Sequence, residues 1–138
     1  MAFTVTGLDK AIRNIQAIEY RIQHLEPVLN EFGKMGVESI HKNFTVGGRP
    51  KRWKLTEDGK KPLTKSSKLK NSIKYRVKSS KVTIFSKVKY AATHNYGRTI
   101  RTKNGTYYIP KRRFMMLQKK DIKTMKKKLP KYIVEGKV

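Results

Sequence analysis

The sequence predicts an α+β fold in which two N-terminal helices and a C-terminal helix pack on a small, mostly antiparallel sheet of about four strands. Apolar residues recur every three or four positions at both ends of the chain, and apolar and polar residues alternate in its middle. An Asn-Gly pair marks a tight hairpin turn. We expect a single domain over residues 1–138 that buries roughly 68% of the surface of its unfolded chain.

The helical part, residues 1–44, contains two predicted helices. The first follows an apolar stripe: Leu8, Ile12, Ile15, Ile18, Ile22 and Leu25. Pro27 disfavours the helical conformation at Glu26, so it ends or kinks the first helix, and it suits the first turn of a second helix. Gly33 and Gly36 lie inside the second helix, where they either permit close approach of another backbone or mark a local break.

Residues 45–65 form a predicted long loop, because glycines and prolines interrupt any period. These breakers are Gly47, Gly48, Pro50, Gly59 and Pro62. A connection of this length inside a compact domain is usually functional or disordered. We therefore expect the loop to contact a partner with Trp53 as its anchor, and the alternative that Trp53 packs only within its own subunit stays open.

The β-rich part, residues 66–117, contains two predicted hairpins. The strands of the first are marked by alternating apolar residues: Ile73, Tyr75, Val77, Val82 and Ile84. Its turn falls at residues 79–81. The second hairpin turns at Asn104 and Gly105, the pair favoured where both turn residues need positive φ.

The last part, residues 118–138, is predicted to form a basic helix that begins near Asp121. Its apolar residues recur at three and four residue spacing: Ile122, Met125 and Leu129. We expect the helix to be disturbed at Pro130, because proline lacks the backbone N–H that a helix interior uses.

The chain carries a formal charge of +25, from 34 Lys and Arg against nine Asp and Glu. Residues 1–48 contain five basic and five acidic side chains, so the excess belongs to residues 49–138, with 29 basic and four acidic. Such asymmetry points to nucleic acid, an anionic membrane or an acidic protein as a partner, and it does not choose among them.

Composition also excludes several classes. There is no cysteine, which excludes disulfides, thiolate metal sites and a cysteine nucleophile. No apolar run approaches the ~20 residues of a membrane span, and the start MAFTVTGLDK lacks a signal-peptide pattern. We therefore expect a soluble protein made in the cytoplasm, without a membrane partner.

The candidate catalytic residues lack partners. His94 is a candidate general base or metal ligand, but the other histidines, His24 and His41, lie on predicted helices at no metal-ligand spacing. The adjacent Glu57 and Asp58 fall in the long loop, which favours a solvated turn over an acid and base pair. The segment TVGGRP lacks the ending of a phosphate-binding loop. We expect no catalytic residue, no metal and no cofactor.

A basic run near the end of the chain offers anion contacts. Ten Lys or Arg lie between Lys111 and Lys131, opposed only by Asp121. Such a run gains affinity for nucleic acid by counterion release, although charge runs are more often solvated faces. The candidate contacts are Lys111, Arg113, Lys119, Lys120, Lys123, Lys126, Lys127 and Lys128. Three aromatic residues near this run, Tyr107, Tyr108 and Phe114, are candidates to stack on bases, although tyrosines on a hairpin more often pack within the chain.

Three segments are informative when their order and spacing are taken together: FTVGGRPKRWKL (44–55), KYAATHNYG (89–97) and IPKRRFM (109–115). Together they resemble the tail-completion, or virion morphogenesis, proteins of tailed bacteriophages, in which F-x-x-x-G-x-P-x-x-W-x-x-L, Y-A-x-x-H-x-x-G and I-P-x-R-x-F-[LM] follow a helical start. The matching positions are Gly48, Pro50, Trp53, Leu55, Pro62, Leu63, Leu69, Tyr90, Ala91, His94, Gly97, Pro110, Arg112 and Phe114. The segment SSKLKNSI departs from the pattern, because it lacks the usual glycine before the leucine.

The resemblance implies a structural protein of the virion, made in the cytoplasm of the host bacterium. Such a protein acts at the end of the tail or at the head-tail junction as an oligomeric ring, with other tail or connector proteins as partners and without enzymatic activity. In this interpretation His94 fixes a turn, Tyr90 and Ala91 pack, and Gly97 lets the chain reverse. The alternatives are a basic nucleic-acid-binding module with nonspecific DNA contact and, more remotely, a small nuclease using His94 and Tyr90.

Overall fold

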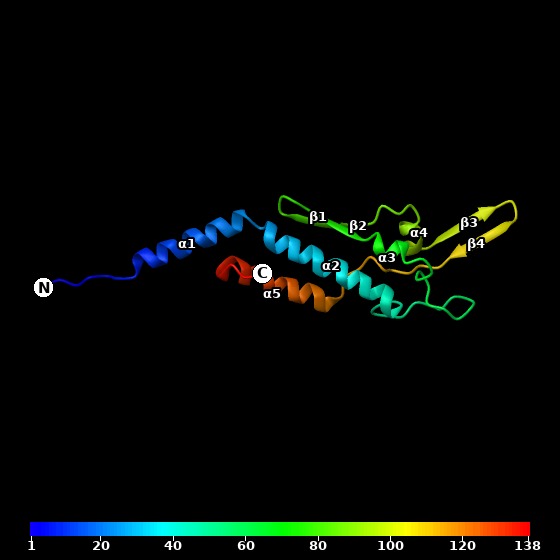
Figure 1. Cartoon of the computed structure of the whole chain (residues 1–138), viewed down its shortest axis with the longest axis horizontal. Coiled ribbons are helices and arrows are strands. Elements are labelled where there is room, and N and C mark those ends of the chain that lie inside the picture. Colours follow the sequence, from blue (N-terminus) through cyan, green and yellow to red (C-terminus); the bar gives the residue numbers. More distant parts are fainter.

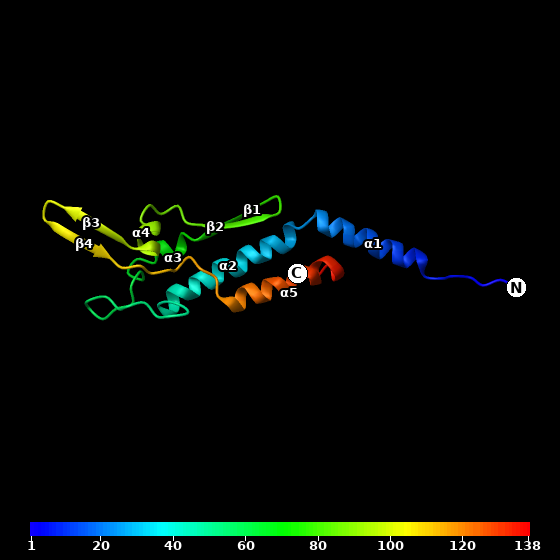
Figure 2. The same cartoon turned by 180° about the vertical axis from the view of Figure 1, so that it is seen from behind.

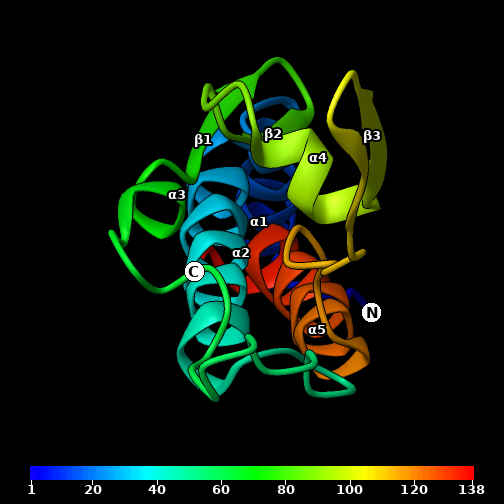
Figure 3. The ribbon, with the colours of Figure 1, turned by 90° about the vertical axis from the view of Figure 1, so that its right-hand side faces the viewer.

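A computed structural model describes all 138 residues. Its elements, in chain order, are α1 (Leu8–Gln23), α2 (Glu26–Val46), α3 (Lys68–Asn71), β1 (Lys74–Lys78), β2 (Lys81–Phe85), α4 (Ala91–Tyr96), β3 (Arg98–Thr102), β4 (Gly105–Ile109) and α5 (Lys119–Glu135). Helix α2 is central, because it packs against both α5 and the β1–β2 hairpin. The end view shows α2 and α5 side by side, with the strands above them (Figure 3). The predicted α+β class is confirmed.

The four strands form two separate two-stranded antiparallel sheets, whereas we expected one small sheet. In the first sheet Tyr75 lies opposite Ile84 and Val77 lies opposite Val82, so the apolar residues share a face as their alternation predicts. Lys78 pairs with Lys81, so the turn consists of Ser79 and Ser80 and is one residue shorter than the predicted turn at 79–81. This sheet lies on α2. The second sheet extends away from the helices at one end of the molecule (Figure 1).

The second hairpin is confirmed, but its turn lies one residue earlier than predicted. Thr102 pairs with Gly105, so the turn residues are Lys103 and Asn104. The Thr102 hydroxyl accepts a hydrogen bond from the Asn104 N–H and donates one to the Gly105 carbonyl, at 3.2 and 3.1 Å. Of the Asn-Gly pair only the glycine has a positive φ, of 137°. The threonine side chain thus closes the turn that the Asn-Gly pair was expected to close.

The first two helices are separated just before Pro27, as the sequence predicts. Helix α1 ends at Gln23, and α2 begins at Glu26 with Pro27 in its first turn. Helix α2 ends at Gly47, which has a left-handed φ of 77° and donates its N–H to carbonyls of the last turn. Glycine adopts this conformation without the strain that a Cβ brings, so it ends the helix.

Two glycines inside α2 let the β1–β2 hairpin lie directly on the helix. A Cβ at Gly33 would lie 2.1 Å from Cδ2 of Tyr75, and a Cβ at Gly36 would lie 2.3 Å from Cδ1 of Ile84. Both distances are far below van der Waals contact, so larger residues would push the hairpin away. Helix α2 is continuous through both positions. The glycines therefore serve close packing and do not mark a break.

The hydrophobic core lies where the C-terminal half of α2 meets α3, α4 and the segment after β4. Its six buried members are Ile40, Phe44, Leu69, Ile73, Ala91 and Phe114. The rings of Phe44 and Phe114, 1% and 0% exposed, have centroids 5.0 Å apart. The short helices α3 and α4 were not expected, and each contributes one core residue, Leu69 and Ala91 respectively.

Helix α5 continues through Pro130 to Glu135, contrary to the expected disturbance. Residues outside α5 form hydrogen bonds that hold its last turns. The hydroxyl of the buried Tyr132 donates to the His24 carbonyl at 2.6 Å, and Arg21 donates to two carbonyls of the last turn at 3.0 and 2.8 Å. These contacts with the α1–α2 connection offset the backbone hydrogen bond that Pro130 removes.

The molecule is elongated. The N-terminus and α1 extend from one end, and the β3–β4 hairpin extends from the other (Figures 1 and 2). The accessible surface is 10947 Å² for 16.1 kDa, whereas a compact monomer of this mass exposes roughly 7,400 Å². By the same scaling, folding removes only about half of the surface of the unfolded chain. The expected value of roughly 68% was therefore wrong, because α1 and the β3–β4 hairpin lie away from the core.

The apolar stripe of α1 faces solvent. No residue of α1 is buried, and Ile12 and Ile15 are 45% and 64% exposed. The helix touches the rest of the chain near its C-terminal end, where Arg21 bonds to α5. The predicted amphipathic helix is confirmed, but its apolar face has no partner within the chain.

Candidate functional site

The three sequence segments that we singled out meet at the C-terminal end of α2. The Phe44 ring contacts both Trp53 and Phe114, with ring centroids 5.9 and 5.0 Å apart. The His94 carbonyl accepts a hydrogen bond from the Arg112 N–H at 2.9 Å, which ties the second segment to the third. The fold therefore brings together three stretches that lie far apart in the sequence.

A polar network beneath this site joins α2 to the segment before α5. The fully buried Asn43 donates its amide N–H groups to the carbonyls of Phe114 and Met116, at 2.8 and 2.9 Å. Its amide oxygen accepts from Nε of Arg49 at 2.8 Å. One side chain thus holds both the loop after α2 and the segment that carries Phe114.

Arg49 extends this network to α5. Its guanidinium donates to the Ser39 carbonyl at 2.6 Å and to the Ser39 hydroxyl at 2.8 Å. That hydroxyl donates to the Asp121 carboxylate, which also accepts the Gln118 N–H at 2.8 Å and so caps α5. The guanidinium is therefore held in one orientation, and Asp121, the acidic residue we expected near the helix start, forms a capping box with the N-cap residue Gln118.

Trp53 is half-buried, and its indole lies nearly perpendicular to the Phe44 ring, at an interplanar angle of 81°. Its backbone N–H donates to the Gly47 carbonyl at 2.7 Å. Gly48 has a φ of 111°, and a Cβ there would lie 2.8 Å from Cδ1 of Trp53. Glycine at this position is needed both for the backbone conformation and for the indole to lie where it does.

His94 lies on the short helix α4, and not in the plain turn that we predicted. Its ring is half-buried, edge-on to Tyr90 with centroids 5.7 Å apart, and its Nδ1 atom is buried without a hydrogen-bond partner. Burial, and to a lesser extent the charge of Arg112, lowers the pKa of His94. Burial also lowers the pKa of Arg112, whose Nε is likewise buried without a partner.

His94 lies close to a reversal of the chain and has no acidic partner. No carboxylate forms a hydrogen bond or ion pair with either His94 or Arg112, so the imidazole has no acidic group to orient it. Ala91, one turn before, is buried in the core, and Tyr90 is 40% exposed. A Cβ at Gly97 would lie 2.9 Å from the Lys111 N atom, and its φ is 76°, so the chain reverses closely here. The His94 segment thus joins the core to a close reversal of the chain.

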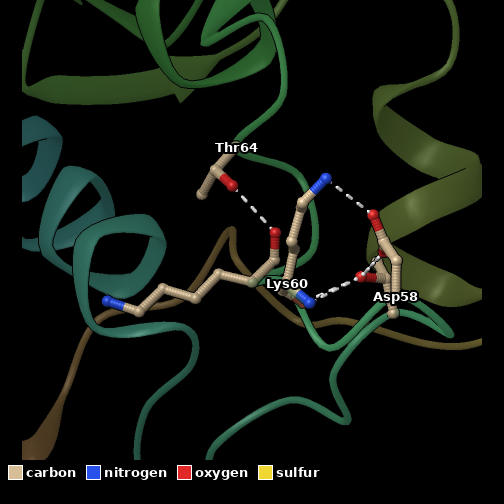
Figure 4. Close-up of polar contacts among 5 residues, drawn as sticks. Asp58, Lys60 and Thr64 are labelled. Carbon is tan, nitrogen blue, oxygen red and sulfur yellow. Dashed lines mark hydrogen bonds and ion pairs between the residues drawn. The ribbon is translucent and has the colours of Figure 1, made fainter.

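The tip of the long loop is closed by its own polar groups (Figure 4). Thr56 donates to Asp58 at 2.6 Å, Lys60 pairs with the same carboxylate at 2.9 Å, and Thr64 donates to the Lys61 carbonyl at 2.8 Å. The hydrogen bond from Thr56, followed by that from Lys60, lowers the pKa of Asp58. The side chain of Asp58 is 60% exposed. These contacts are those of a solvated turn.

The remaining motif positions lie around the same end of the molecule. Leu55 is 54% exposed, and Pro50 is exposed after a cis peptide bond. Pro110 is half-buried at the end of β4. Tyr107 and Tyr108, which sequence alone left between packing and stacking, are 56% and 71% exposed and do not pack within the chain. The expectation that Phe114 stacks on bases is wrong, because its ring is fully buried in the core.

The basic residues divide into two groups. Lys111 and Arg113 lie beside the loop that carries Trp53 and line a groove there. The other six candidate contacts lie on α5: Lys119, Lys120, Lys123, Lys126, Lys127 and Lys128. Of these, Lys128 pairs with Glu31 of α2 at 3.3 Å, so it contributes to helix packing.

Sequence reasoning missed the residues that hold this site together, namely Ser39, Asn43 and Arg49. The first two fall at positions of α2 where an apolar residue would continue the buried face, and this was the available signal. Nowhere in the chain do three His, Cys, Asp or Glu side chains come close enough to hold a metal ion. None of the helices has the length and apolar character needed to cross a membrane.

Comparisons with known proteins agree with the motifs. No match was found among curated proteins or among solved structures. The model of the phage virion morphogenesis family matches residues 5–133, which is nearly the whole chain. The match includes α1, the loop with Trp53, both hairpins and most of α5. The chain belongs to the phage virion morphogenesis family.

Proposed function

We propose that this chain is a structural subunit that completes the phage tail or the head-tail junction, and that it acts there as a homo-oligomeric ring. It is made in the host cytoplasm and becomes part of the virion, where its other partners are tail or connector proteins. Membership of the virion morphogenesis family supports the assembly role. The observation that carries the ring is the unpartnered apolar face of the N-terminal arm, residues 1–22, and the occupant we assign to it is a second copy of the chain.

The exposed area supports this occupant. The chain exposes 10947 Å², which exceeds the surface of a compact monomer by roughly 3,500 Å². A stable interface removes about 800 Å² from each partner, so a ring subunit with two neighbours needs about 1,600 Å². The excess is large enough for both interfaces.

The charge distribution favours a second copy over other partners. The arm contains three basic and two acidic side chains, so +24 of the net +25 lies elsewhere. Two such cationic bodies repel one another. A segment that carries almost no net charge and a continuous apolar stripe is the part of one copy that another can accept with least repulsion. An anionic partner, by contrast, gains little from contact with the arm.

The opposite end of the molecule provides a second unpartnered element. All residues of β3 and β4 are exposed except Ile109, which is half-buried. An isolated two-stranded hairpin is marginally stable in water, so contact with a neighbour would stabilise it. Distinct surfaces at the two ends suit head-to-tail contacts, which close into rings when the rotation between subunits allows it.

The first test measures assembly of the purified chain by sedimentation velocity over a range of concentrations. We expect oligomers for the parent and monomers for Ile12→Asp combined with Ile15→Asp, because both side chains are exposed in the monomer and their replacement leaves the fold intact. The matched control, Lys10→Gln combined with Arg13→Gln, lowers the charge by the same amount on the polar face of α1 and should assemble as the parent does. Equal assembly of all three proteins would refute the role of the arm.

The second test examines particles by electron microscopy of lysates from an in-frame deletion, its parent and a complemented strain. We expect filled heads lying apart from tails, or tails of abnormal length, in the deletion strain alone. Joined particles in normal yield would overturn the assembly role. A fourth strain carries Ile12→Asp combined with Ile15→Asp in place of the parent gene. If the deletion strain is defective and this strain forms normal particles, the assembly role stands and the ring contact through the arm is rejected.

A further inference from the structure

A groove beside Trp53 gathers positive charge from two separate segments. Six of its nine lining residues are Lys or Arg and none is acidic. The six are Arg49, Lys51, Arg52, Lys54, Lys111 and Arg113. The groove, which we call the Trp53 groove, has a volume of about 450 Å³. Its two walls belong to the loop after α2 and to the segment after β4.

These charges are not neutralised within the chain. The three ion pairs of the structure join Lys60 to Asp58, Lys128 to Glu31 and Lys137 to Glu135, all outside the groove. Four of the groove cations are exposed and form no hydrogen bond to the chain: Lys51, Lys54, Lys111 and Arg113. Like charges held this close repel one another, and an anion that occupies the groove removes that cost.

Two features of the groove are fixed in place. The Arg49 guanidinium is held by Ser39 and Asn43, and the Trp53 indole is held against the Phe44 ring. The groove therefore presents mobile cations around a rigid aromatic wall. A free phosphate or an acidic peptide makes use of the cations alone. A nucleic-acid strand makes use of both parts, because its phosphates meet the cations and its bases stack on aromatic rings.

We infer that the Trp53 groove binds a single strand of nucleic acid, with the exposed cations on successive phosphates and Trp53 against a base. This function goes beyond the proposed assembly role and does not depend on it, since the arm takes no part in the groove. Of the basic residues that the sequence offers as anion contacts, the groove uses Lys111 and Arg113. The lysines of α5 do not line it.

The chain contains one tryptophan, so its fluorescence reports on this groove directly. Titration of the whole protein with a dT12 oligonucleotide should quench Trp53. If four cations contact phosphates, the slope of log affinity against log salt is about −3, and affinity falls roughly 50-fold between ~50 and ~200 mM salt. Replacing Lys51 and Arg113 together with glutamine should reduce the magnitude of that slope by about 1.4.

The matched control is Lys78→Gln combined with Lys81→Gln, which makes the same charge change at the exposed turn of the β1–β2 hairpin. We expect this pair to bind dT12 with the slope of the parent. Equal weakening by both pairs would overturn the inference, because affinity would then follow net charge alone. So would binding without quenching, equal affinity for a duplex of the same length, or equal binding of a polyglutamate of matched charge.

Discussion

Replacing Asn43 with leucine removes the side chain that joins three segments around the core. Asn43 is completely buried, and its replacement leaves the carbonyls of Phe114 and Met116 and the Nε of Arg49 without their partner. Each buried group left unpaired costs about 1 to 3 kcal/mol. Leucine has the same branched four-atom skeleton as asparagine and is larger, so it leaves no cavity, and its burial returns about 1 to 2 kcal/mol. We expect a net destabilisation of roughly 3 kcal/mol.

Urea unfolding followed by the fluorescence of Trp53 measures this loss. The matched control is Asn30→Leu on the same helix, because the Asn30 amide donates to the Glu26 carbonyl at 3.0 Å in an exposed position. Its replacement should change the free energy of unfolding by less than about 0.5 kcal/mol. If Asn43→Leu also stays within about 0.5 kcal/mol of the parent, the network does not hold the loop and the segment after β4 together, and the reasoning fails.

Three further changes test the geometry of the same site. Gly48→Ala should lower the free energy of unfolding by more than about 2 kcal/mol, because its Cβ would lie 2.7 Å from a backbone oxygen. Gly59 also has a positive φ but lies in open space, so Gly59→Ala should cost only about 1 kcal/mol. Equal losses for the two variants in urea unfolding would contradict this difference. Phe114→Ala should lower the unfolding free energy by about 3 to 5 kcal/mol in thermal unfolding, and a loss below about 1 kcal/mol would show that Phe114 is not a core residue. Burial and the charge of Arg112 lower the folded-state pKa of His94, so the unfolded state takes up this proton at a higher pH than the folded state. The stability that neutral His94 contributes is therefore complete above about pH 6.5 and is lost as the pH falls below it. His94→Gln should flatten this part of the profile of unfolding free energy against pH, and an unchanged profile would contradict the lowered pKa.

Local patterns predicted most of the elements because local physics forms them. The three and four residue spacing places α1, α2 and α5, and Pro27 separates the first two, since both effects act within one or two turns. Alternation predicts which residues of β1 and β2 share a face, whereas their register depends on the two-residue turn at Ser79 and Ser80, which was predicted one residue too long. Even the two glycines of α2 are anticipated as places of close approach, although what approaches, Tyr75 and Ile84, depends on tertiary packing.

What the sequence could not give depends on contacts between distant segments. An apolar stripe says that a helix face is buried, but not in which molecule, and the stripe of α1 finds no partner in its own chain. Pro130 is tolerated inside α5 because Tyr132 and Arg21 hold the following turn. Asn43 and Arg49 meet only after the chain has folded, so no spacing marks them. The Trp53 groove likewise arises from two segments that the sequence offers separately.

The arm and the Trp53 groove lie at opposite ends of α2, because the arm precedes its first residue and the groove begins just after its last. A helix of 21 residues is about 30 Å long, so the neighbour that covers the arm lies at the end of α2 away from the groove. A ring joined through arms would then repeat the groove once per subunit, and a long strand could occupy several grooves together. We therefore expect Ile12→Asp combined with Ile15→Asp to bind dT12 as the parent does, but to bind a dT60 strand at least about tenfold more weakly, because multivalency is lost. Fluorescence titrations of both proteins with both strands test this. If the variant loses as much affinity for dT12 as for dT60, the arm shapes the groove itself. If it binds dT60 as tightly as the parent does, the grooves do not act together.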